Sequence, residues 1–181
     1  ALTNKSVNGV TLTAAGTAGQ GLNGAGAYAD RIVLGTPVTT TSGTSIDFTG
    51  LPAGVKRITI NFAGVSVSGS SIIIIQLGDS GGIENTGYLG SGSSAGGTAA
   101  NFTDGFGLNG TVAASVYNGS FILSLTDSAT FTWTCQGIVG LSNTNNLFLT
   151  GGQKSLSAVL DRVRITTQGG SDTFDAGKIN I

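Results

Sequence analysis

The chain has 181 residues, of which 31 are Gly and only 9% are charged, with a formal net charge of −1. Glycine usage is more than twice the average of roughly 7%, and charge is far below the roughly 25% of ordinary soluble domains. Binding of nucleic acid is not expected, because phosphate contacts need clustered Lys and Arg. The 39% hydrophobic content argues against a disordered chain. Such a composition is typical of β-rich extracellular or virion proteins with many tight turns.

Residues 1–30 are small, polar and rich in glycine. Alone they cannot bury enough apolar area to offset the entropy of ordering. We predict an extended shaft or linker that packs against other copies of itself. Residues 19–24 match the dinucleotide pattern GxGxxG, but no amphipathic helix follows to hold a pyrophosphate, so the match is attributed to chance.

Residues 31–181 predict a single head domain built from short strands, the first of them over residues 31–34, 37–41 and 44–48. Ile58, Ile60 and Phe62 then alternate with polar residues, which indicates a half-buried strand. The four isoleucines at 72–75 have no polar face, as expected of a strand covered on both sides. We predict that these two strands form the core.

Later elements complete the predicted fold. Asn118-Gly119 predicts a hairpin turn, because both central residues of a type I′ turn need positive φ. Trp133 and Cys135 share one face of an alternating strand with Phe131, which indicates core packing, and a surface platform for stacking sugars is the alternative. Further strands are expected at 159–166 and 178–181. The fold class predicted is all-β, an antiparallel β-sandwich resembling a jelly roll.

A long stretch rich in Gly, Ser and Thr, residues 80–110, is predicted to be a functional loop. Aromatic rings beside amides and carboxylates suit a glycan, whose CH groups stack while its hydroxyls find donors and acceptors. Packing between subunits is the alternative for the same loop. The tentative ligand-binding residues are Asp79, Glu84, Asn85, Tyr88, Asn101, Phe102, Asp104 and Phe106.

No catalytic residue and no enzyme activity are predicted. Residues 78–82, GDSGG, match the sequence around the nucleophile of trypsin-like proteases, but a chain without histidine lacks the general base for Ser80. Asp79, Glu84 and Asp104 could supply the carboxylate pair of a glycosidase, yet nothing marks a sugar-binding cleft.

No cofactor, metal or disulfide is predicted either. The single cysteine excludes an intrachain disulfide, and with no histidine a conventional zinc site is excluded as well. Asp172 and Asp175 could contribute oxygens to calcium, but a solvated turn is the preferred interpretation. No signal peptide and no membrane span are expected.

Several stretches resemble a known family. LTNKSVNGVTL at residues 2–12, followed by GLNGAGAY at 21–28, resembles the shaft-to-head stretch of tailed-bacteriophage tail fibres, although Gly21 and Ala25 replace the usual Phe and Asp. DFTGLPAGVKRITINFAGVS, QLGDSGGIENTGY and the final FDAGKINI resemble a C-terminal head module of phage and prophage fibre proteins. The resemblance covers most of the chain.

This resemblance implies a homotrimer on the virion tail, assembled in the cytoplasm of the bacterial host. Its partners would be other virion tail proteins and a host surface polysaccharide, with no nucleic acid and no membrane insertion. The expected function is non-enzymatic attachment to the host cell. The alternatives are a structural virion protein, such as a decoration or fibre-attachment module, and a polysaccharide-degrading tailspike.

Overall fold

The computed structural model describes residues 6–7, 10–11, 20–22, 28–30 and 32–181. The chain divides into two units, residues 1–35 and 36–181. In the first unit, β1 (Ser6–Val7) pairs with β2 (Val10–Thr11), and β3 (Gln20–Leu22) pairs with β4 (Tyr28–Asp30), both antiparallel. The predicted shaft over residues 1–30 otherwise lies outside the described residues. In the described parts of the chain, no helix is long and apolar enough to span a membrane.

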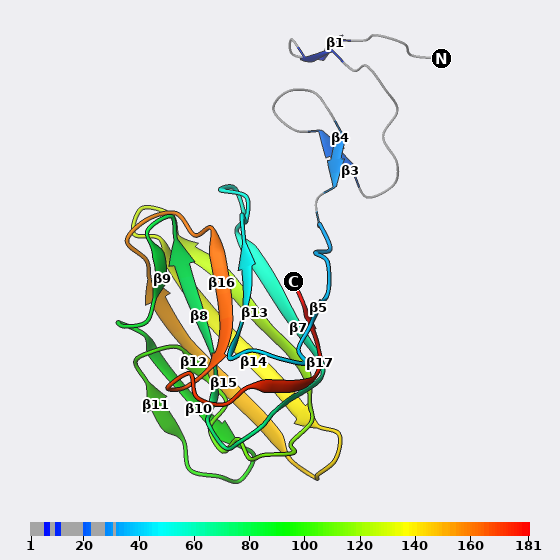
Figure 1. The fold of residues 1–181 in the computed structure, drawn as a ribbon. Helices are drawn as coiled ribbons and strands as arrows, with labels where there is room; N and C mark the ends of the chain where they lie inside the picture. Colours follow the sequence, from blue (N-terminus) through cyan, green and yellow to red (C-terminus); the bar gives the residue numbers. More distant parts are fainter. Residues whose placement is uncertain (1–5, 8–9, 12–19, 23–27, 31) are drawn as a thin grey trace. The chain divides into compact units, whose positions relative to one another are not determined.

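Residues 36–181, all of which are described, form an antiparallel β-sandwich without helices, as predicted (Figure 1). The larger sheet has eight strands, in the order β11 (Ala100–Phe102), β10 (Leu89–Ser94), β15 (Leu147–Ser155), β14 (Thr132–Leu141), β13 (Tyr117–Asp127), β7 (Arg57–Val67), β17 (Phe174–Asn180) and β5 (Val38–Thr39). The smaller sheet has the order β12 (Phe106–Gly107), β8 (Ile73–Asp79), β16 (Arg162–Thr167) and β6 (Ser45–Thr49), with β9 (Gly82–Glu84) also paired to β8.

The core lies between the two sheets. In β7, Ile58, Ile60 and Phe62 are buried as their alternation predicted. Every residue of β8 is buried, because one side faces the core and Gly105 lies against Ile74 on the other. Both strands therefore carry the core, but they belong to facing sheets and do not pair with each other.

The predicted hairpin turn at Asn118-Gly119 is wrong, since both residues lie inside the long strand β13. This strand pairs with β14 on one side and β7 on the other, and the turn to β14 comes only at residues 128–131. The register with β7 shifts beside Asn118, whose Oδ1 accepts a hydrogen bond from the Gly64 N–H at 2.8 Å. The Asn-Gly pair therefore belongs to a β-bulge.

The prediction of one long loop at residues 80–110 is also wrong. That stretch contains β9 to β12, and β10 pairs with both β11 and β15. All residues of β10 after Leu89 are Gly or Ser, so its place in the sheet comes from backbone hydrogen bonds to its neighbours. The strand predicted at 31–34 is absent from the described residues 32–34.

Trp133 and Cys135 are buried in the core, as predicted. Burial raises the pKa of the Cys135 thiol far above its ordinary value. We expect no reaction of the folded protein with a disulfide-exchange reagent at neutral pH, and complete reaction after unfolding in guanidinium chloride. The absorbance of the released thiolate measures both states. Rapid labelling of the folded protein would contradict the buried position.

Candidate functional site

Asp79 and Glu84 are held by partners inside the protein. Asp79 is 3% exposed, and its two oxygens accept hydrogen bonds from the Ser157 hydroxyl at 2.6 Å and the Gly81 N–H at 2.8 Å. Glu84 accepts a hydrogen bond from the Ser157 N–H and forms an ion pair with Lys154, whose side chain is 6% exposed. These contacts fasten the β8–β9 turn to the segment after β15.

Hydrogen bonds lower the pKa of both carboxyl groups. For Asp79 the main cause is the Ser157 hydroxyl, followed by the Gly81 N–H. Burial raises the pKa of Glu84, but hydrogen bonds from Lys154 and Ser157 outweigh it and lower this pKa overall. Both groups are therefore charged at neutral pH, in contrast to the raised pKa of a general acid.

The three aromatic residues of the predicted set are buried. Tyr88 and Phe106 have no exposed surface, and Phe102 is 3% exposed. The Tyr88 hydroxyl donates to the Glu84 carbonyl at 2.9 Å and accepts from the Leu77 N–H at 2.6 Å. Its ring meets Phe106 edge to face, with centroids 5.1 Å apart. These rings pack the core and offer no face on which a sugar could stack.

Asn85 and Asp104 are brought together at a polar pocket of about 270 Å³. The pocket lies on the outer side of the smaller sheet, where Gln76 of β8 and Arg164 of β16 are register partners. The remaining predicted residue, Asn101, is exposed on β11, beside Ser91 of β10.

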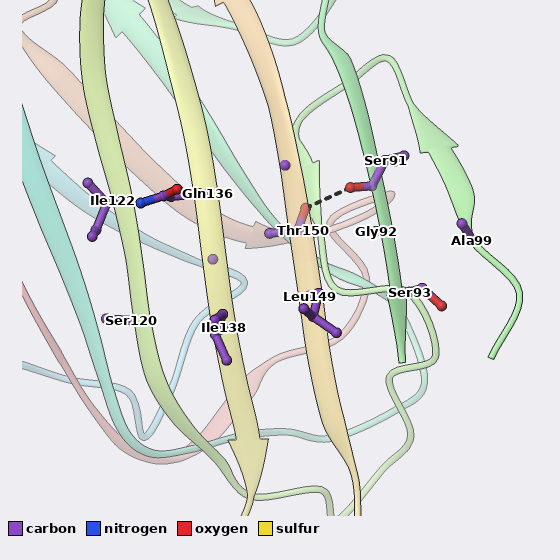
Figure 2. A pocket seen from close by; sticks show the side chains of 12 residues that line it. Ser91, Gly92, Ser93, Ala99, Ser120, Ile122, Gln136, Ile138, Leu149 and Thr150 are labelled. Atoms are coloured by element: carbon purple, nitrogen blue, oxygen red, sulfur yellow. Dashed lines mark hydrogen bonds between the residues drawn. The ribbon is translucent and has the colours of Figure 1, made fainter. Parts of the chain in front are cut away.

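A larger open groove of about 520 Å³ lies on the outer face of the larger sheet, across β10, β15, β14 and β13 (Figure 2). The strand register arranges its side chains in two rows. The first row is Ser91, Gly151, Gln136 and Ile122, which Asn101 continues on β11. The second row is Ser93, Leu149, Ile138 and Ser120.

The groove combines apolar and neutral polar surface. Figure 2 shows Ile138 and Leu149 side by side, and these side chains are 58% and 45% exposed. Gln136 supplies an amide, and Gly151 leaves the first row open between Gln136 and Ser91. Among the described residues that line the groove, no side chain is charged. The arrangement suits a neutral ligand that carries both hydroxyls and apolar faces.

Most of this groove was not predicted from the sequence, because the prediction considered only the buried face of the strand at 130–136. The opposite face of that strand, with Thr134 and Gln136, was the available signal. Its partners lie on the neighbouring strands β13 and β15, and only the pairing register shows which of their side chains meet it. Comparison with protein-family models, with curated proteins and with solved structures found no match.

Proposed function

We propose that this chain is the non-enzymatic attachment module of a bacteriophage tail fibre and that its groove holds a polysaccharide of the host surface. The observation that carries the proposal is the neutral groove across β10, β15, β14 and β13, in which amide and hydroxyl groups stand beside exposed aliphatic side chains. The resemblance of residues 47–66 and 76–88 to fibre head modules supports the same function.

A sugar unit matches this surface group by group. The Gln136 amide can both donate to and accept from sugar hydroxyls, and Ser91 and Ser93 add hydroxyls at the other side of the groove. Ile138 and Leu149 offer apolar contact for the CH face of a ring. The open, shallow form allows a long chain to lie across the strands without its ends having to enter a cavity.

Attachment through such a groove gains from several copies. In the proposed homotrimer, located on the virion tail, three grooves engage one polymer or one cell surface. Simultaneous engagement raises effective affinity by roughly 10² to 10⁴ when the geometry permits it. The mass of the purified protein in solution tests this part of the proposal, and a monomer at micromolar concentration would contradict it.

Filling the groove at Gly151 is the direct test of the site. A Cβ atom at this position would meet only the Cys135 carbonyl oxygen, at 3.6 Å, which is ordinary contact. Gly151→Leu is therefore expected to leave the melting temperature within about 2 °C of wild type, as for most substitutions away from the core. We expect it to reduce binding to an array of bacterial surface polysaccharides, and to host cells, by at least tenfold.

Gly54→Leu is the matched control, because a Cβ at Gly54 has no atom within 4 Å and its turn contributes nothing to the groove. This variant is expected to bind like wild type. Equal binding by both variants would remove the groove from the proposal.

The exposed aliphatic groups favour a second candidate, a structural virion module that contacts another tail protein. Leu89 and Leu147 lie on the same sheet face as Ile138 and Leu149 and are 67% and 37% exposed. The polysaccharide array distinguishes the two functions. A structural module is expected to bind purified tail proteins and none of the polysaccharides on the array.

A further inference from the structure

The polar pocket on the outer side of the smaller sheet is built from both sheet and loop residues. Arg164 lies between Gln76 on β8 and Asp47 on β6. Its Nε and Nη2 donate to the two carboxylate oxygens of Asp47, each at 2.7 Å. This bidentate pair fixes the plane of the guanidinium group at one side of the pocket.

Two loops form the walls. The loop before β12 is tied down by the Gln76 amide, which donates to the Asp104 carbonyl at 2.8 Å, and by the Gln168 amide, which donates to Asp104 Oδ2 at 3.0 Å. The second loop is the turn after β16, where Gly169 and Gly170 have φ of 80° and 63° and carry no side chain into the opening. The pocket is thus held open by fixed partners.

Several polar groups remain available there. Within the described residues, Arg164 Nη1 and the exposed amide of Asn85 make no side-chain hydrogen bond. Asp104 Oδ1 is shielded from solvent and has no hydrogen-bond partner. Leaving a shielded acceptor unsatisfied is unfavourable, and a small rotation of the carboxylate toward the pocket would let a bound hydroxyl donate to it.

Size and charge narrow the ligand class. At about 270 Å³ the pocket is just below the roughly 300–1,000 Å³ of sites for drug-sized molecules. Asp47 neutralises Arg164, so Asp104 gives the pocket a net negative charge and disfavours an anionic ligand. The free groups of Arg164, Asn85 and Asp104 would pair best with a ligand whose hydrogen-bond donors and acceptors lie close together. Vicinal hydroxyls have this arrangement.

We propose that this pocket is a second binding site, which takes a single neutral sugar unit. Asp104 accepts hydrogen bonds from its hydroxyls, while Asn85 and Arg164 donate to them. The pocket and the groove lie on opposite sheets, so one polysaccharide with side branches, or two separate glycans, can occupy both. The ligand class rests on the proposed function, but the site itself rests on the geometry of the pocket.

Nuclear magnetic resonance of the ¹⁵N-labelled protein tests the site with a panel of free neutral monosaccharides, namely hexoses, 6-deoxyhexoses and N-acetylhexosamines. We expect at least one of them to shift the side-chain amide signals of Asn85 and Gln76 saturably, with millimolar affinity. Asp104→Asn should weaken this binding at least tenfold, and Asn85→Ala several-fold. Asn101→Ala, which alters the edge of the groove, should leave it unchanged.

The proposal is overturned if no sugar of the panel shifts these signals, or if Asp104→Asn binds like wild type while retaining a folded spectrum. Should Asp104→Asn not fold, unchanged binding by Asn85→Ala overturns it instead, because Asn85 is exposed and, within the described residues, its side chain makes no hydrogen bond. The binding role of the groove is tested separately, because Gly151→Leu alters the groove and leaves the pocket unchanged. Sugar binding at Asn85 together with no adsorption to host cells would contradict the attachment function and support the pocket as a sugar-binding site.

Discussion

Replacing Lys154 by methionine is expected to lower the free energy of unfolding by about 2–3 kcal/mol, because Glu84 then loses its cation in a mostly shielded position. The Glu84 side chain is 23% exposed, so solvent recovers part of the full cost. Lys154 also donates to the Ser155 carbonyl at 2.7 Å and lies 5.6 Å from the centre of the Tyr88 ring. Urea denaturation measures the loss.

The surface pair of Arg162 and Asp161 provides the comparison. Both side chains are more exposed than Lys154, at 28% and 31%. Asp161→Asn should lower the free energy of unfolding far less than Lys154→Met does, because solvent screens this exposed pair. The double variant Lys154→Met/Glu84→Gln should be less destabilised than the sum of its single changes, since no unpaired charge remains. Additive losses would show that the two side chains act independently.

The carboxylates of Glu84 and Asp79 make the free energy of unfolding depend on pH. The folded pKa of Glu84 lies below its ordinary 4.5, and that of Asp79 below 3.8. Their stabilisation is therefore complete above these ordinary values and is lost as the pH falls through the lower folded values. The difference in unfolding free energy between wild type and Glu84→Gln should be largest at pH 7 and shrink toward pH 3. A constant difference would assign the role of Glu84 to packing.

A second large loss of stability is expected from Gly119→Ala, of about 3 kcal/mol. Gly119 has φ of 151°, and a Cβ there would lie 2.3 Å from the Ile138 carbonyl oxygen and 2.8 Å from Val139 Cα. These are backbone atoms of β14, so no side-chain rotation relieves the clash. Thermal and urea denaturation both report the change.

Gly140→Ala is the matched control on the neighbouring strand. A Cβ at Gly140 would have its nearest atom, the Asn118 carbonyl oxygen, at 3.9 Å. This variant should stay within about 0.5 kcal/mol of wild type. If both alanine variants are equally stable, the close approach of β13 and β14 at Gly119 is not a constraint on the fold.

The pair Asn118-Gly119 was predicted to be a turn but lies inside a strand, which shows what a local sequence pattern does not determine. Alternation over residues 57–62 and 130–136 identified strands and their buried faces, because a period of two depends only on local geometry. Asn-Gly has two structural uses, a turn and a bulge with close backbone approach, and the dipeptide itself does not distinguish them.

The candidate sites were harder to predict for a related reason. Tyr88 and Phe106 are surrounded in sequence by Gly and Ser, which suggested a loop, yet strand pairing to β8 and β15 encloses them. Asn85 and Asp104 were identified together, but Arg164 and Gln76 join them only through the register of β8 and β16. Neither the groove nor the pocket has a local sequence pattern, because each is assembled from side chains of several strands.

Strand β5 determines how the sandwich would respond to tension on the chain that precedes it. It is an edge strand joined to β17 by only two register pairs, Val38 with Ile179 and Thr39 with Lys178. The adjoining Thr40 adds a backbone bond to Gly177 and a hydroxyl bond to the Ala176 carbonyl. Tension on the chain ahead of residue 36 therefore acts first on this short ladder. Detachment of β5 would lengthen the preceding chain by a few residues while β7 to β17 remain folded, so the groove and the pocket would keep their geometry under a pull that has already released this strand.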